Sequence, residues 1–243
     1  MLSLYGNAIL KSARNPLKES GPVVRSSVQE QIVLAAERLF AEHGLDGVSL
    51  RQISAAAGSG NNTAVQYHFG TKDRLIQAIF EYRLPGLNER RTVLAARRRP
   101  DDLRSWVECH VLPILEQGEQ AGSHYLSFVA MLQQHSRRDV FDALAAELRA
   151  PIEVFFVRVG TLLPHIPEPL RRHRIAHALA FSVHAAAERE RARTRGGQVL
   201  PFAVHVGDLL DGVVGFLEAP VSAATRSALA EAGPREFALP VQP

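Results

Sequence analysis

The chain has 243 residues, of which 46% are hydrophobic and 22% are charged, and its formal net charge at pH 7 is +3. This composition is typical of a folded globular protein and excludes disorder over the whole length. The longest nearly apolar run, 176–187, contains polar residues and is shorter than the roughly 18 apolar residues of a membrane-spanning helix. We therefore expect no membrane partner. The first residues lack the basic leader of a secretory signal, so the expected location is the cytoplasm.

Basic side chains are concentrated in the first part of the chain. Residues 1–100 contain six more Lys and Arg than Asp and Glu, whereas residues 101–243 contain three more acidic than basic side chains. Such a split suggests that the N-terminal part meets a polyanion. However, the segment 26–85 alone has a net charge of about −1, because the excess lies in the first 25 residues and in the arginines of 90–99. The alternative to a polyanion-binding surface is therefore that these arginines are solvated and have no partner.

Regular helical patterns begin after an N-terminal stretch that shows no hydrophobic period. Ser27 and Glu30 have the spacing of a capping box, and apolar residues follow at intervals of three and four as far as Gly44. A glycine at this place favours the end of a helix, because it adopts the left-handed conformation freely. Ser49 and Gln52 form a second capping box and open a second, shorter helix.

A third short segment, "NNTAVQYHF" at 61–69, has a narrow apolar side and a strongly polar outer side. Gly70 ends it, and Thr71 can cap a fourth helix. Three short helices with a glycine turn before the last are typical of a helix-turn-helix motif. In that motif Asn and Gln of the outer side pair with base edges in the major groove, while hydroxyl groups reach phosphates. A polar helix that merely faces solvent is the alternative.

Residues 27–80 resemble the tetracycline-repressor (TetR) family of bacterial regulators, through "AAERLFAEHGLDGVSLRQISAAAG" and the following "YHFGTKDRL". The resemblance implies an all-α fold with an N-terminal three-helix helix-turn-helix DNA-binding domain at 26–72. A larger helical ligand-binding and dimerisation domain is implied at 73–219, flanked by a flexible basic arm at 1–25 and a C-terminal tail at 220–243. The implied function is a ligand-responsive transcriptional repressor. It would bind a palindromic double-stranded DNA operator as a homodimer and be released by a small hydrophobic or aromatic effector.

The resemblance also implies which side chains contact DNA. The implied set is Arg51, Asn61, Asn62, Thr63, Gln66, Tyr67, His68 and Lys72. The sequence departs from the family pattern in two ways. The turn "GSGNN" is about one residue longer than the common form, and Gln66 stands where many members have a phosphate-binding tyrosine, with Tyr67 one place later. The match to the family pattern can therefore be shifted by one residue at this place. Which of these side chains contact bases and which contact phosphates stays open.

The rest of the chain has helical patterns separated by Pro or Gly, with breaks expected at Pro85-Gly86, Pro100, 118–122, 164–169 and 196–197. The last two strong helices are expected at about 168–193 and 202–218, and both have apolar faces. The resemblance implies that they form an intersubunit four-helix bundle, which would hold the two reading heads at the spacing of successive major grooves. Completion of a monomeric core is the alternative.

A ligand pocket between the middle helices is implied by the resemblance and not by any motif. The candidate lining residues are mostly aromatic, with a few polar groups, which suits a flat or apolar effector. They are Trp106, His110, Tyr125, Phe128, Met131, Phe155 and Phe181. Each of them taken singly is more often an ordinary core residue.

Two other classes of protein were weighed. His173, His177 and His184 share one face of a predicted helix, but no carboxylate or thiolate nearby completes a zinc site, so neither metal nor cofactor is expected. A helical small-molecule or metal sensor with weak or lost DNA binding stays open as the alternative function. The sequence contains no nucleophile elbow, Walker lysine or dinucleotide fingerprint, so we expect no enzymatic activity.

Overall fold

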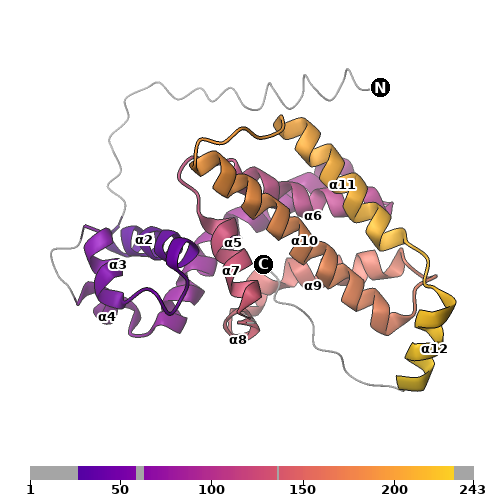
Figure 1. The fold of residues 1–243 in the computed structure, drawn as a ribbon, viewed down its shortest axis with the longest axis horizontal. Coiled ribbons are helices and arrows are strands. Elements are labelled where there is room, and N and C mark those ends of the chain that lie inside the picture. The colour runs from indigo at the N-terminus through magenta and orange to yellow at the C-terminus, as the bar shows by residue number, and fades with distance from the viewer. Residues whose placement is uncertain (1–26, 59–62, 136, 233–243) are drawn as a thin grey trace.

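The computed structural model describes residues 27–58, 63–135 and 137–232, and within these ranges it contains helices and no strand. Figure 1 shows a small group of helices, α2 to α4, at one end of a larger helical body. We call α2 to α4 the head and α5 to α11 the body. The helices are α2 (Val28–His43), α3 (Leu50–Ala56), α4 (Ala64–Phe69), α5 (Lys72–Arg98), α6 (Leu103–Gly118), α7 (Tyr125–Gln134), α8 (Arg138–Asp142), α9 (Ala146–Thr161), α10 (Glu168–Thr194), α11 (Phe202–Glu218) and α12 (Ala223–Ala232). The predicted all-α fold is confirmed.

The first two helices begin where the capping signals predicted. The Ser27 hydroxyl accepts a hydrogen bond from the Glu30 backbone N–H at 3.1 Å. Ser49 and Gln52 form a complete capping box at the start of α3. The box predicted at Ser27 is only half present, because the Glu30 carboxylate instead accepts from the Tyr82 hydroxyl at 2.7 Å. That contact joins α2 to α5.

Helix α5, the first helix of the body, begins next to the head and is continuous over its 27 residues. A break was predicted at Pro85-Gly86, and this prediction is wrong: the helix passes through both residues. An interior proline costs about 3 kcal/mol. Leu84 and Leu87 on either side are buried, and burial of each such side chain contributes about 1.5–3 kcal/mol, so packing outweighs the local penalty.

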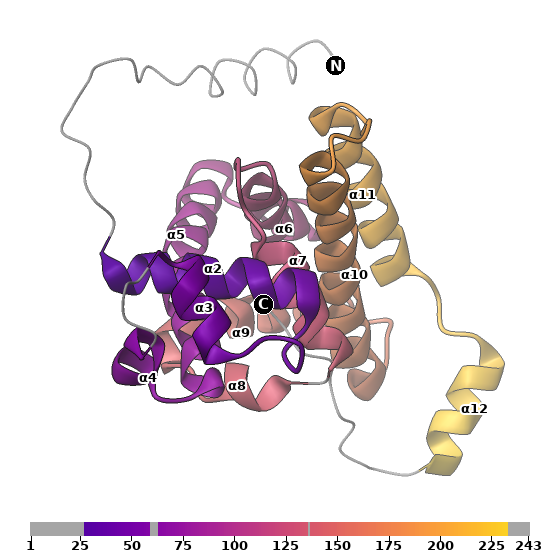
Figure 2. The same cartoon turned by 60° about the vertical axis from the view of Figure 1, so that its left-hand side comes forward.

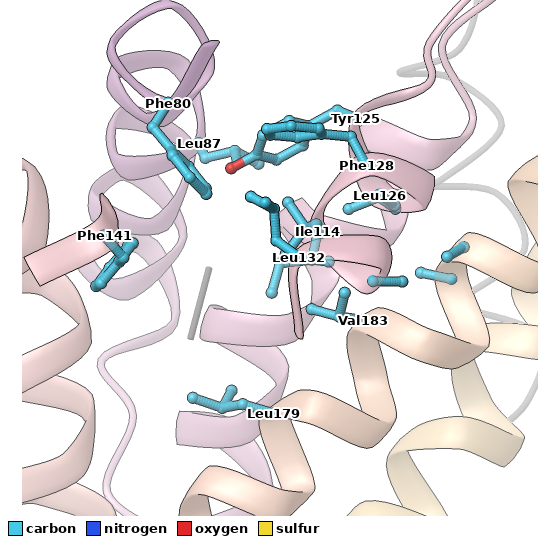
Figure 3. Close-up of a cluster of buried hydrophobic side chains, with 14 of the residues drawn as sticks. Phe80, Leu87, Ile114, Tyr125, Leu126, Phe128, Leu132, Phe141, Leu179 and Val183 are labelled. Atoms are coloured by element: carbon cyan, nitrogen blue, oxygen red, sulfur yellow. The ribbon is translucent and has the colours of Figure 1, made fainter. Parts of the chain in front are cut away.

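The centre of the body is α7, whose residues 125–132 are all buried. A helix that is buried all round must be covered on every side by other helices. Helix α2 of the head packs on α7, and so does α10 of the body. Figure 3 shows side chains of α5, α6, α7 and α10 meeting around it, among them Phe80, Ile114 and Val183. The head therefore shares its central support with the body.

Three of the arginines of 90–99, Arg90, Arg91 and Arg98, make contacts within the body. Arg90 pairs with Glu116, and Arg98 pairs with Glu108, each at 2.8 Å, while Arg91 is buried. Acidic partners on α6 thus neutralise two of these charges. Arg90 and Arg98 therefore contribute less to the basic excess than the sequence alone indicated, while Arg97 and Arg99 are exposed.

Helices α10 and α11 form an antiparallel pair along one side of the body (Figure 2). Most residues of their predicted apolar faces are buried, but Phe181, which belongs to the predicted face of α10, is exposed, as are Val204 and Phe216. Helix α12 lies within the predicted C-terminal tail and has no buried residue. Within the described ranges, none of the helices combines the length and the apolarity that crossing a bilayer requires.

Candidate nucleic-acid interface and its link to the body

Helix α4 has a buried side and an exposed side. Ala64 and Val65 are buried, whereas Gln66, Tyr67 and His68 are exposed, and Tyr67 is 83% exposed. Thr63, at the N-cap position, is exposed as well. The described part of the polar face predicted from sequence therefore points away from the protein.

Two cations of the predicted DNA-contact set lie on α3 and α5, the helices before and after α4 in the chain. Arg51 is exposed in the first turn of α3. Lys72 is half-buried, and its Nζ donates a hydrogen bond to the Leu45 carbonyl at 2.8 Å. Lys72 therefore stabilises the turn between α2 and α3, a role that sequence reasoning did not anticipate.

His68 is also held by the protein, because its Nδ1 lies 3.3 Å from the Gln29 amide nitrogen of α2. This contact fixes the C-terminal end of α4 against the first helix of the head. Asn61 and Asn62, predicted to contact bases or phosphates, lie outside the residues that the structure describes. The predicted roles of all these side chains on DNA stay predictions.

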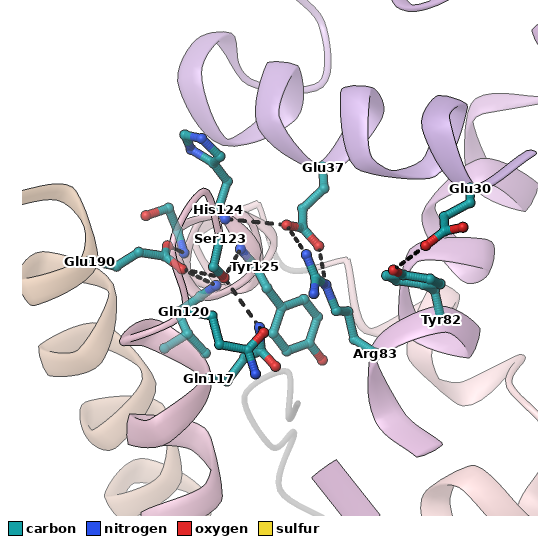
Figure 4. Close-up of polar contacts among 12 residues, drawn as sticks. Glu30, Glu37, Tyr82, Arg83, Gln117, Gln120, Ser123, His124, Tyr125 and Glu190 are labelled. Atoms are coloured by element: carbon teal, nitrogen blue, oxygen red, sulfur yellow. Dashed lines mark hydrogen bonds and ion pairs between the residues drawn. The ribbon is translucent and has the colours of Figure 1, made fainter. Parts of the chain in front are cut away.

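The head is joined to the body by a buried ion pair. Glu37 of α2 is 1% exposed, and its carboxylate accepts two hydrogen bonds from the Arg83 guanidinium of α5, at 2.7 and 2.8 Å. Its Oε1 also accepts from the backbone N–H of His124, at 3.2 Å, just before α7 (Figure 4). Sequence reasoning missed this group. The available signal was a carboxylate on the apolar face of α2, four residues after Val33 and three before Phe40.

A second buried carboxylate, on α10, binds residues just before and at the start of α7. Glu190 of α10 accepts hydrogen bonds from the backbone N–H groups of Ser127 and Leu126, at 2.8 and 3.4 Å, and from the Ser123 hydroxyl at 2.9 Å. Helix α7 has no side-chain cap of its own, so Glu190 caps it from another helix. Burial raises the pKa of Glu190, while these hydrogen bonds oppose the rise. We call residues 123–125 the junction.

A third buried polar group lies between α5, α6 and α7. Arg91, His110 and Tyr125 are buried, and Arg91 Nη2, His110 Nε2 and the Tyr125 hydroxyl have no hydrogen-bond partner. Arg91 donates from Nε to the His110 carbonyl at 3.4 Å and from Nη1 to Asn88 at 3.0 Å. Burial lowers the pKa of Arg91 to about 10, and burial together with Arg91 lowers the pKa of His110 well below its usual value. We call these three side chains the buried polar centre.

The low pKa of His110 predicts loss of stability in acid. The unfolded state binds this proton below about pH 6.5, whereas folded His110 stays neutral, so its contribution is present above that pH and lost as the pH falls. We expect the free energy of unfolding to fall by up to about 1.4 kcal/mol per pH unit below 6.5 from this group. Urea unfolding at pH 7.5, 6.5 and 5.5 measures it.

His110→Gln is the control for that measurement, because it removes this titration and keeps the other titrating groups. The raised pKa of Glu190 acts in the opposite direction and the lowered pKa values of His173 and His205 in the same direction, but all three are common to both proteins. The variant should show a shallower loss between pH 6.5 and 5.5. Parallel curves for the two proteins would contradict the assignment to His110.

The structure brings most of the predicted pocket residues together inside the body. His110, Tyr125, Phe128, Met131 and Phe155 are buried, and Trp106 is half-buried. The His110 and Phe155 rings stack with centroids 4.1 Å apart. Phe181 is 54% exposed, so the prediction that it lines the interior is wrong. The physical reason is helical phase: α10 turns Leu179 and Val183 inward and Phe181 outward.

The three histidines weighed as metal ligands all lie on the exposed side of α10. The rings of His173 and His177 have centroids 4.1 Å apart, whereas His184 lies beside Glu188 at 3.5 Å. Among the residues that the structure describes, no three His, Cys, Asp or Glu side chains are grouped as a metal site requires. The metal-sensor alternative thus gains no support from the arrangement of these side chains.

Residues 32–79 match the family model "Bacterial regulatory proteins, tetR family". Over 61 residues the chain is 43% identical to the HTH-type transcriptional repressor Rv3405c of Mycobacterium tuberculosis, which covers 25% of this chain and 32% of that protein. Over 51 residues it is 37% identical to the HTH-type transcriptional repressor AcnR of Corynebacterium efficiens, covering 21% and 27%. The matches thus span about a third or less of the length of these curated relatives.

The fold as a whole is similar to that of a solved transcriptional regulator from Rhodococcus sp. Rha1, with a TM-score of 0.53 and 21% identity over 79% of this chain and 96% of that chain. At this identity the likeness concerns the fold alone. The segment matched by the family model contains most of α2, all of α3 and α4, and the beginning of α5. The head is thus the part of the chain that is similar to the TetR family of bacterial regulatory proteins.

Proposed function

We propose that the protein is a transcriptional repressor that acts in the cytoplasm and places α4 in the major groove of an operator. The observation that carries this proposal is the exposed polar side of α4. Helix α4 lies within residues 32–79, the segment that matches the family model. The major groove is about 12 Å wide and admits one helix. The proposed contacts are Arg51, Thr63, Gln66, Tyr67, His68 and Lys72, together with Asn61 and Asn62, which precede α4.

We further propose that two copies associate through α10 and α11. Phe181, Val204 and Phe216 leave apolar surface exposed on this pair. Helix α11 also contains Gly207, Gly212 and Gly215, and a Cβ added to any of them would meet no atom within 4 Å. An interior glycine costs about 1 kcal/mol relative to alanine, but it lets a second helix approach closely. A symmetric dimer would read a palindromic operator with half-sites about 34–36 Å apart.

Release by a small-molecule effector requires that the body influence the head. Two rigid connections run through the junction: His124 binds Glu37 of the head, and Ser123 binds Glu190 of the proposed dimer helix. In the proposed mechanism an effector bound in the body shifts the junction and, with it, the two heads. It favours a head separation that no longer fits the operator.

DNA binding is tested with a palindromic duplex selected from a random-sequence pool, by fluorescence anisotropy across a salt series. We expect tight binding that weakens steeply with salt, because phosphate contacts release counterions. Gln66→Ala should weaken binding to the selected duplex by about tenfold or more, the value of one good base contact. Arg51→Ala should weaken binding to all sequences and reduce the salt slope by about one.

Gln198→Ala is the matched control, since Gln198 is an exposed glutamine in the loop between α10 and α11. It should change the affinity less than twofold. Sedimentation of the complex should give two chains per duplex, or a multiple of two. Equal effects of Gln66→Ala and Gln198→Ala, or no binding at low salt, would refute the proposal. Lys72→Ala is a less clean test, because it also removes the hydrogen bond to Leu45.

A further inference from the structure

The buried polar centre has an uncompensated charge. Arg91 is 6% exposed, and none of the ion pairs between residues of the described ranges includes it. Its neighbour Arg90, by contrast, pairs with Glu116. Burying a guanidinium without a carboxylate is strongly unfavourable, since solvation is lost and no Coulombic attraction replaces it. A protein keeps such a charge at a cost, and a site for an anion is a direct reason for keeping it.

The buried polar centre contains three hydrogen-bonding atoms without a partner, one on Arg91 itself and one on each of its neighbours His110 and Tyr125. Arg91 Nη2, His110 Nε2 and the Tyr125 hydroxyl are each buried and without a partner. Arg91 follows Leu87 by one helical turn on α5, and His110 precedes Ile114 by one turn on α6. Figure 3 shows Leu87 and Ile114 beside the Tyr125 ring, with the hydroxyl directed toward α5. Burial raises the pKa of Tyr125 and Arg91 opposes this rise, while burial and Arg91 both lower the pKa of His110, as expected if the three side chains share one region of low dielectric.

The surroundings of the centre are apolar. The Phe155 ring stacks on His110, and the Phe80 ring meets the Tyr125 ring edge-on with centroids 6.3 Å apart. His110 is neutral, so Arg91 supplies the one positive charge of the centre. One positive charge in an apolar site is matched by one negative charge. A phosphate monoester carries nearly two and would leave excess charge buried.

We propose that Arg91, His110 and Tyr125 anchor the carboxylate of the effector, a small monocarboxylic acid with an apolar body. A carboxylate offers two oxygens with about four acceptor sites, enough for three donors. A water molecule would satisfy the hydrogen bonds but would leave the Arg91 charge uncompensated. The apolar body of the acid takes its place among the aromatic rings, displacing side chains that close over the centre in this conformation.

The anchor has a direct route to the head. Tyr125 is the last residue of the junction, next to His124, whose N–H binds Glu37. The acid draws the Tyr125 hydroxyl toward Arg91, and the neighbouring backbone, with its bond to α2, moves with it. This regulatory consequence rests on the proposed function, whereas binding of the acid does not.

The test uses the full-length protein and a panel of acids paired with their amides: hexanoate, octanoate, benzoate and phenylacetate against hexanamide, octanamide, benzamide and phenylacetamide. Thermal unfolding and calorimetric titration measure binding without DNA. We expect at least one acid to bind and raise the melting temperature, and its amide to bind at least tenfold more weakly. The same acid should release the selected duplex in the anisotropy assay.

Arg91→Met should weaken binding of that acid at least tenfold and should itself fold well, because replacing an unpaired buried charge by an apolar chain is favourable. Tyr125→Phe keeps the ring and removes only the hydroxyl, and should weaken binding about tenfold. Arg90→Met is the matched control, and it should leave binding unchanged. Circular dichroism confirms that each variant is folded.

Each result decides one question. Equal binding of acids and amides, full binding to Arg91→Met, or no acid binding at all would overturn the anchor, even if DNA binding is intact. An acid that binds wild type but not Arg91→Met supports the anchor, even if the protein then binds no DNA. In that case only the proposed regulatory function fails.

Discussion

Replacing Glu37 by alanine is expected to lower the free energy of unfolding by about 3–5 kcal/mol, the cost of leaving one partner of a buried ion pair alone. Glu37 and Arg83 have side chains that are only 1% and 12% exposed, so water cannot replace the lost carboxylate. The substitution also leaves the His124 N–H without its acceptor. Urea unfolding at pH 7.5 measures the change.

The matched control is Glu81→Ala. Glu81 pairs with Arg74 at 3.0 Å, but both side chains are more than 40% exposed, and such pairs contribute about 0–1 kcal/mol. A second variant, Glu37→Leu combined with Arg83→Met, should recover much of the lost stability, because it leaves no unpaired charge. If Glu37→Ala costs no more than Glu81→Ala, the pair does not hold the head in place.

The same pair makes a prediction about coupling. The double variant keeps the head packed on the body but removes the polar link from α2 to the junction. If effector and operator communicate through that link, the double variant should still bind the operator, yet release it at a higher effector concentration. In this variant, operator binding reports whether the head is still packed on the body. The effector concentration needed for release reports the coupling between the two sites.

Local features of the fold could be predicted from the sequence because their causes lie within a few residues. The caps at Ser27 and Ser49 and the polar side of α4 are all visible in short windows. The passage of α5 through Pro85 could not be predicted, because it depends on burial of flanking side chains against helices far along the chain.

The candidate regulatory site was only partly predictable for the same reason. The buried aromatic candidates lie in the same part of the body as the proposed anchor, but Arg91 lies in an arginine-rich stretch that looks like solvated surface. Glu37 and Arg83 are 46 residues apart, and Ser123 and Glu190 are 67 apart. Whether a charged side chain is buried depends on such distant partners. A carboxylate on an apolar helix face was the one local sign of them.

Glu190 gives the second large prediction. Glu190→Ala removes the acceptor of two buried backbone N–H groups at the start of α7 and of the Ser123 hydroxyl, and it should lower the free energy of unfolding by about 3 kcal/mol. Glu190→Gln keeps one carbonyl oxygen as an acceptor, so its loss should be smaller. Glu188→Ala, two residues earlier on α10, removes a side chain that is 66% exposed and should change stability by less than about 0.5 kcal/mol.

The pH dependence measures how far the hydrogen bonds to the Glu190 carboxylate offset the cost of its burial. Because burial raises the pKa of Glu190 above its unfolded value, its titration adds stability at low pH that is lost as the pH rises through the folded pKa. The stability advantage of wild type over Glu190→Gln should therefore be larger near pH 5 than near pH 8. An advantage that does not change with pH would mean that the Glu190 carboxylate is as well solvated in the fold as in the unfolded chain. The hydrogen bonds from Ser123, Leu126 and Ser127 would then offset the whole cost of burying that carboxylate.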